Sequence, residues 1–128
     1  QLAVIKRMVR DLNMDIEIVG CPIVREEDGL AKSSRNTYLS SEERKAALIL
    51  SKTVALGEEL KKKKKDANKV VEAMKKNIET EPLAKIDYVE AVDALSMAPV
   101  EKLEGTCMLA MAVYIGKTRL IDNTLINE

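Results

Sequence analysis

The fold is decided by residues 107–121, CMLAMAVYIGKTRLI. The first nine residues of this stretch are strongly apolar, which predicts a central β-strand from Cys107 to Ile115. Gly116-Lys117 is a two-residue connection suited to a type II′ turn, and residues 118–121 supply the second strand of a hairpin. An antiparallel sheet is therefore expected in the last part of the chain.

The triplet Gly116-Lys117-Thr118 also resembles the end of a phosphate-binding loop. That motif requires a glycine five residues before its Gly-Lys pair, where this chain has Met111, and it requires a following helix rather than a strand. The hairpin interpretation is therefore preferred at this turn.

Helices are expected before the sheet. Ser40, with Glu43 three residues later, fits a capping box at the start of a long helix, and Gly57 weakens that helix in its middle. Asp66 begins another helix that ends near Thr80, and residues 86–91 are expected to form a further strand before a loop at residues 94–104. Helices followed by an antiparallel sheet predict a small α+β domain.

The first 22 residues have a different character. Leu2, Ile5, Val9 and Leu12 share one face of a helix that has no capping residue before it. Residues 15–22, DIEIVGCP, predict a strand bounded by glycine and proline. A helix followed by a strand is the closing half of a β-α-β unit, and its parallel neighbours are not in this sequence. We therefore expect the chain to begin inside a longer domain.

Composition excludes several classes of function. The chain has 21 Lys and Arg against 21 Asp and Glu, so it lacks the basic excess of a nucleic-acid binder. It has no histidine, which removes Ser-His-Asp or Cys-His catalysis from within the chain, and the usual imidazole metal sites. The five lysines at 61–65 are interpreted as a solvated helix end. No apolar run is long enough for a membrane span or a signal peptide.

The two cysteines, Cys21 and Cys107, lie far apart and lack CxxC spacing. They are interpreted as buried free thiols rather than as a disulfide, in a protein of the reducing cytoplasm.

The main candidate site is the polar stretch DGLAKSSRN at residues 28–36. It can be a plain linker with a pair of helix-capping serines. It also lies just beyond the predicted strand at residues 15–22, where ligands bind in open α/β sheets. Its hydroxyls, backbone N–H groups, Lys32 and Arg35 suit a polyphosphate, because an arginine can bind phosphate oxygens in a bidentate manner.

Several blocks of the sequence resemble the pantothenate synthetase family, in order and at family-like spacing. They are QLAVI at 1–5, DIEIVG at 15–20, PIVR at 22–25, DGLA at 28–31, SSRN at 33–36 and RLIDN at 119–123. The SSRN block is similar to that family's version of the Lys-Met-Ser-Lys-Ser loop of class I aminoacyl-tRNA synthetase-like nucleotidyl transferases. The resemblance covers nearly the whole chain, although the helices within residues 46–81 match only in pattern.

This resemblance implies a ligase that uses ATP and Mg²⁺ to join pantoate to β-alanine through a pantoyl adenylate. By position, the ATP-binding residues would be Val24, Lys32, Ser33, Ser34 and Arg35. Val24 would contact the adenine end through its backbone, and Gln1 would hydrogen-bond pantoate. Lys32 stands where the family usually has an apolar residue, a departure that a backbone contact to ATP would tolerate.

The resemblance also implies that this chain is a fragment. Residues 1–36 would close a Rossmann-like ATP-binding domain, and residues 37–128 would form a small α+β lid domain. The family's His-x-Gly-His motif, a second pantoate-binding glutamine and a Gly-Glu-Lys-Asp stretch would precede Gln1. No catalytic or metal-binding residue is therefore expected in this chain, which should be inactive alone, and the full-length protein would be a homodimer. The alternative is a non-catalytic interaction or dimerisation module whose SSRN loop is only a linker.

Overall fold

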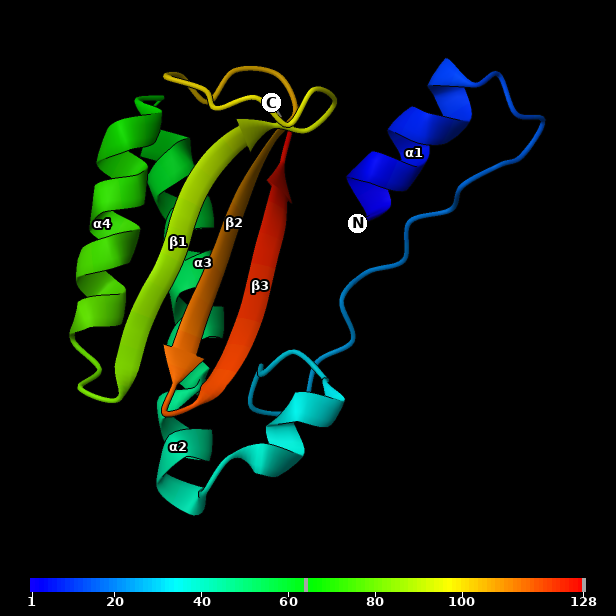
Figure 1. Cartoon of the computed structure of the whole chain (residues 1–128). Helices are drawn as coiled ribbons and strands as arrows, with labels where there is room; N and C mark the ends of the chain where they lie inside the picture. Colours follow the sequence, from blue (N-terminus) through cyan, green and yellow to red (C-terminus); the bar gives the residue numbers. More distant parts are fainter. Residues whose placement is uncertain (64, 128) are drawn as a thin grey trace.

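The structure, a computed structural model, describes residues 1–63 and 65–127. An N-terminal helix and an extended segment lead into a three-stranded sheet with two long helices on one face (Figure 1). In chain order the elements are α1 (Leu2–Asp11), the 3-10 helix η1 (Ser34–Tyr38), α2 (Ser41–Ala46), α3 (Leu48–Lys63), α4 (Ala67–Glu79), β1 (Ala84–Asp93), β2 (Cys107–Ile115) and β3 (Thr118–Ile126). This is the mixed α/β architecture that the sequence predicts.

The sheet is antiparallel with the order β1-β2-β3, so the apolar stretch at 107–115 is its central strand, as predicted. Gly116 has a φ of 59° and Lys117 has no positive φ, which fits the predicted type II′ turn. β3 continues to Ile126 rather than ending at Ile121. Its polar residue Asp122 is accommodated because its carboxylate pairs with an arginine from another segment.

The helices α3 and α4 cover one face of the sheet and enclose the core (Figure 1). The predicted capping box is present, with Ser40 Oγ accepting from Glu43 N at 3.2 Å, and Asp66 caps α4 as expected. The helix expected to run on from Ser40 is instead two helices separated at Ala47. Ala47 is fully buried, and its small side chain lets the chain turn tightly against the core. The largest fully buried side chains are Leu50, Met74, Ile78, Leu103, Leu109, Met111 and Ile115.

The lysine run follows the prediction in part. Lys62 and Lys63 are exposed in the last turn of α3, and Lys65 is exposed after it. Lys61 is half-buried and donates to the carbonyl of Asn127. Lys64 lies outside the described residues.

The N-terminal segment corrects one prediction. α1 forms as expected and has no side-chain cap, but residues 15–22 do not form a strand. The backbone there is extended, and no strand in the described part of the chain lies beside it, so a ladder of hydrogen bonds is missing. Ile16 and Val19 are consequently open to solvent, 54% and 69% exposed, and Ile18 is half-buried.

The cysteine prediction is half right. Both thiols are free and Cys107 is buried, but Cys21 is exposed because it belongs to this unpaired segment. Among the described residues, none of the helices has the length and apolar character that crossing a membrane requires.

Candidate functional site

A short hairpin carries the start of the predicted ATP loop. Lys32 N donates to Val24 O at 2.9 Å, and Glu26 N donates to Leu30 O at 2.8 Å. Gly29, with a φ of 97°, makes the turn between the two arms. Leu30 anchors the hairpin because its side chain is buried in the core. The hairpin therefore places Val24 directly opposite Lys32.

The 3-10 helix η1 follows at once and orders the SSRN block. Ser33 Oγ accepts from Arg35 N at 3.2 Å, and the side-chain amide of Asn36 donates to Ala31 O at 3.0 Å. Since Ser33 uses its oxygen as the acceptor in this bond, its hydroxyl hydrogen stays free to donate to a ligand. Thr37 Oγ1 closes the turn by donating to Ser34 O at 2.7 Å.

A cavity of about 450 Å³ lies between this loop and β3. It brings together three of the predicted ATP-binding residues, Lys32, Ser33 and Arg35. Within the described part of the chain, the buried Oδ1 of Asn36 at this cavity has no hydrogen-bond partner. Side chains of both signs line the cavity, and its other walls include Ile23, Leu30, Leu50, Arg119, Leu120 and Asn123.

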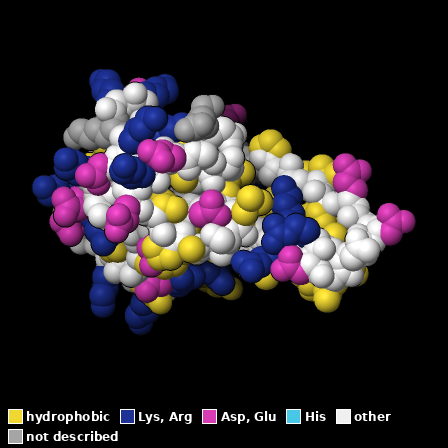
Figure 2. All heavy atoms as spheres, turned by 90° about the horizontal axis from the view of Figure 1, so that it is seen from above, with side chains coloured by type: hydrophobic (Ala, Val, Ile, Leu, Met, Phe, Trp, Pro, Cys, Tyr) yellow, Lys and Arg dark blue, Asp and Glu magenta, His cyan; other side chains and the backbone are white. Residues whose placement is uncertain are grey.

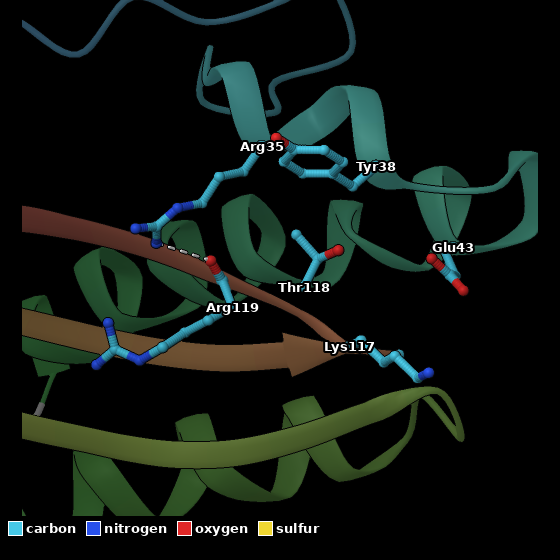
Figure 3. Close-up of a pocket in the computed structure, with 7 residues that line it drawn as sticks. Arg35, Tyr38, Glu43, Lys117, Thr118 and Arg119 are labelled. Carbon is cyan, nitrogen blue, oxygen red and sulfur yellow. Dashed lines mark hydrogen bonds between the residues drawn. The ribbon is translucent and has the colours of Figure 1, made fainter.

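Arg35 also lines a second, more open hollow of about 830 Å³ near the β2–β3 turn (Figure 3). Its Nη1 donates to the carbonyl of Arg119 at 3.2 Å, which satisfies an acceptor on the outer edge of β3. Lys117 points away from both arginines, toward the end of the hollow where Glu43 lies (Figure 3). Within this hollow, an anion bound at Arg35 would therefore meet the positive charges of Arg35 and Arg119 rather than that of Lys117.

Arg119 is held in place by its neighbours on β1. Its Nε donates to Asp87 Oδ2 at 2.9 Å, and its guanidinium lies 5.9 Å from the centre of the Tyr88 ring. The hydrogen bond to Asp87 raises the pKa of Arg119, so its charge is permanent. Arg119 lines both hollows, as does Arg35.

An ion pair joins the hairpin to β3. The Nη1 and Nη2 atoms of Arg25 donate to Asp122 Oδ2 at 2.8 Å and Oδ1 at 2.9 Å, in a bidentate arrangement. The Asp122 side chain is 1% exposed and the Arg25 side chain 30%. Hydrogen bonding to Asp122 raises the pKa of Arg25 above its usual value. Arg25 is therefore a fixed cation, and it is paired with the nearly buried carboxyl group of Asp122.

The other predicted residues, Val24, Ser34 and Gln1, lie outside the cavity of about 450 Å³ beside β3, hereafter the Arg35 cavity. Ser34 is exposed, and Val24 reaches the loop only through its hydrogen bond with Lys32. Gln1 lines a separate cleft of about 490 Å³ between α1 and the face of the sheet that the long helices leave open. This cleft and the Arg35 cavity share three β3 residues, Ile121, Asp122 and Asn123, so they adjoin along β3.

Arg25, Arg119 and Asp122 lie at the site although the sequence did not predict them as site residues. One signal was present. Asp122 is two residues from Leu120, so the two side chains share the buried face of β3, and a buried carboxylate requires a partner. The partner itself lies 97 positions away in sequence, so a single sequence does not identify it.

Charge is distributed without a dominant sign. Figure 2 shows Lys and Arg interspersed with Asp and Glu over the face it displays, and apolar side chains exposed on the smaller lobe at the right, which is the N-terminal segment. In residues 1–63 and 65–127, no three Cys, Asp or Glu side chains converge closely enough to hold a metal ion.

Comparison with known sequences gives consistent matches. The family model for pantoate-beta-alanine ligase matches residues 1–125. The pantothenate synthetase of Enterococcus faecalis is 64% identical over 124 residues, which are 96% of this chain and 44% of the relative. That of Clostridium acetobutylicum is also 64% identical over 124 residues, with the same coverage. This chain thus spans less than half the length of the curated relatives that it matches.

Solved structures of the same family also match this chain. The crystal structure of pantothenate synthetase from Thermus thermophilus matches with a TM-score of 0.88 and 36% identity, covering 96% of this chain and 45% of that one. A pantoate-beta-alanine ligase from Francisella tularensis, complexed with beta-gamma ATP and beta-alanine, matches with a TM-score of 0.60 and 27% identity, covering 98% and 39%.

Proposed function

This chain belongs to the pantoate-beta-alanine ligase family, and from that premise we propose that it is part of an ATP-dependent ligase that joins pantoate to β-alanine. One observation carries the proposal beyond family membership. Lys32, Ser33 and Arg35, chosen from the sequence as ATP contacts, line a single cavity beside β3. The Francisella tularensis relative, complexed with an ATP compound and β-alanine, supports the choice of substrates.

The proposed reaction has two steps. In the first, a carboxylate oxygen of pantoate attacks the α-phosphorus of ATP, the bond to the β-phosphate oxygen breaks, and pyrophosphate leaves with its electron pair. In the second, the amine of β-alanine attacks the acyl carbon of pantoyl adenylate. The acyl–oxygen bond breaks, AMP leaves, and the nitrogen loses a proton as the amide forms.

The main physical difficulty is charge, because an anionic carboxylate must approach an anionic nucleotide. Arg35 offers a fixed guanidinium and Ser33 a hydroxyl donor at the cavity, and preorganised donors of this kind lower the cost of charge that shifts in a transition state. Val24 would meet the adenine end through its backbone, and the exposed Ser34 and Lys32 would contribute backbone contacts over the nucleotide.

Gln1 is assigned to pantoate. The cleft that it lines adjoins the Arg35 cavity along β3, so pantoate held near Gln1 would lie on the side from which it can approach the nucleotide. Mg²⁺ enters the proposal only as a counter-ion of the nucleotide, held through its phosphates.

The rest of the active site is proposed to come from protein outside this chain, including the His-x-Gly-His motif. The exposed apolar side chains of Val4 and Met8 on α1, with Leu12 at its C-terminal end, fit a helix that packs against more of a nucleotide-binding domain. The division at residue 36 stays a prediction, and the burial of Leu30 in the core favours grouping the loop with the small domain.

A chimera tests the proposal. This chain would replace the matching segment of the Enterococcus faecalis pantothenate synthetase, with which it is 64% identical. The purified chimera should form pantothenate from ATP, pantoate and β-alanine, whereas this chain alone should form none. A folded chimera without activity would contradict the ligase proposal. It would favour the alternative of an interaction or dimerisation module, for which the exposed apolar face of α1 is the supporting feature.

A further inference from the structure

The hairpin at residues 24–32 is fixed to the sheet by the ion pair between Arg25 and Asp122, whose carboxylate lies almost out of contact with solvent. The carboxylate of Asp122 is almost fully buried and receives both terminal nitrogens of Arg25, together with the backbone N–H of Asn123 at 2.8 Å. Arg25 Nη1 also donates to Gly29 O at 3.1 Å. One guanidinium therefore links β3 to the first arm of the hairpin and to its turn.

A second ion pair restrains the turn of the same hairpin. Asp28 Oδ2 lies 2.9 Å from Arg44 Nη1 at the start of the helical layer, and this pairing lowers the pKa of Asp28. The Asp28 side chain is 44% exposed whereas that of Asp122 is 1% exposed, so solvent weakens the contact of Asp28 more. The Arg25–Asp122 pair, whose carboxylate is buried and bound by both terminal guanidinium nitrogens, is thus the more specific of the two restraints on where the hairpin lies.

The two segments predicted to contact ATP are attached to this hairpin. Val24 precedes Arg25 directly, and Lys32, hydrogen-bonded to Val24, leads directly into Ser33 and Arg35. A displacement of Arg25 would therefore move the adenine-facing and phosphate-facing segments together. Misplacement of a reacting group by about 1 Å can lower a rate by roughly 100-fold, so a contact that fixes such a loop affects catalysis without touching substrate.

We infer that Arg25 and Asp122 are positioning residues for the adenylation step, holding the Val24 and Ser33–Arg35 segments at the correct distance from β3. This inference rests on the proposed ligase function. It assigns no contact with ATP to either residue.

The test uses the chimera described above with two variants. Arg25→Ala removes the guanidinium but leaves the Asp122 carboxylate buried without its partner, which can unfold the domain. The double variant Arg25→Ala/Asp122→Asn removes that buried charge and so separates positioning from folding. Ile78→Val, at a buried site on α4 away from the hairpin, is the control for lost stability, and Glu59→Gln, which breaks an exposed ion pair with Lys62, is the control for lost charge.

Single-turnover measurements of the two half-reactions give the decisive readout. In both Arg25 variants, pantoyl-adenylate formation should slow by about 10-fold to 100-fold, whereas β-alanine attack on preformed adenylate should be nearly unchanged. Millimolar guanidinium chloride, but not equal sodium chloride, should restore part of the adenylation rate of Arg25→Ala, because the Arg25 site is partly open to solvent. The two controls should leave both half-reactions unchanged.

The possible failures are distinguishable. An unsubstituted chimera that folds but makes no pantothenate would overturn the ligase function and this inference with it. An active chimera whose folded double variant adenylates pantoate at the normal rate would overturn the positioning role alone. Equal slowing of both half-reactions, or equal slowing by Ile78→Val, would show that the pair serves only the stability of the domain.

Discussion

Gly57 of α3 lies directly against Leu109 of β2. A methyl group placed on Gly57 would come within 2.7 Å of Leu109 Cδ1 and 3.0 Å of Met74 Sδ. The glycine is therefore a point of close approach where the helix, the sheet and α4 meet. Its low helix propensity, which marks it as a weak point in the sequence, is compensated by this packing.

Gly57→Ala should lower stability even though alanine is the better helix former. Helix propensity alone would raise the free energy of unfolding by about 1 kcal/mol, but overpacking a core lowers it by about 1–3 kcal/mol. We expect a net loss of about 1 kcal/mol in the free energy of unfolding, measured by urea denaturation. The exposed Ala55→Gly on the same helix is the control, with a loss of about 1 kcal/mol from propensity. If Gly57→Ala raises the free energy of unfolding by as much as Ala55→Gly lowers it, Gly57 is not a point of close packing.

Features set by neighbouring residues could be predicted from the sequence. The apolar run at 107–115 and the Gly116-Lys117 turn define a hairpin by local pattern, and Ser40 with Glu43 defines a helix start by side-chain reach. Residues 15–22 failed for the opposite reason, because a strand exists only where another strand accepts its hydrogen bonds.

At the candidate site, too, the local features were predictable from the sequence and the long-range contacts were not. The hydroxyls and cations of residues 32–35 were visible as a local cluster, and the structure gathers three of them at one cavity. The pairing of Arg25 with Asp122 depends on how β3 and the hairpin pack, which no local pattern encodes. The exposure of Cys21 was missed because its burial was inferred from residue type alone.

Ser40→Ala should destabilise the chain by about 1 kcal/mol, because Ser40 Oγ satisfies the backbone N–H of Glu43 at the start of α2. The matched control is Ser41→Ala, one residue inside the helix, which should change the free energy of unfolding little. Urea unfolding of both variants tests this. Equal effects of the two substitutions would contradict a specific capping role.

The two cysteines should differ sharply in reactivity. Burial raises the pKa of Cys107 and keeps it as a neutral thiol, whereas Cys21 is exposed, and thiolate character and access control alkylation. In the folded chain, maleimide should modify Cys21 alone and should reach Cys107 only after denaturation. Mass spectrometry of digested samples measures this, with Cys21→Ser as the control. Rapid labelling of Cys107 in the folded chain would show that its site is open.

Backbone amides of residues 17–19 should exchange with solvent much faster than those of residues 108–114. The first group lies in extended backbone without a partner strand, whereas the second lies in the central strand, bonded on both sides. Hydrogen exchange followed by NMR, in a sample shown to be monomeric, measures the difference. Equal protection of the two segments in a monomer would contradict the unpaired arrangement.

Arg35 should act on adenylation in the active chimera. Its guanidinium lies at the cavity with Ser33, where charge would pass from the α-phosphate to the departing pyrophosphate. Loss of one preorganised donor costs about 2.7–4 kcal/mol in the transition state, so Arg35→Ala should slow pantoyl-adenylate formation by roughly 100-fold to 1,000-fold.

The attack of β-alanine on preformed adenylate should change far less in this variant, because pyrophosphate has already left. Arg35→Lys should recover only part of the loss, since an ammonium cannot reproduce the planar fork of a guanidinium. Lys117→Ala is the matched control, because Lys117 is a cation of the same hollow that points away from Arg35. Single-turnover kinetics on each half-reaction decides between outcomes. If Arg35→Ala leaves adenylation intact, or if Lys117→Ala slows it equally, the SSRN loop is a linker with general positive charge rather than a phosphate site.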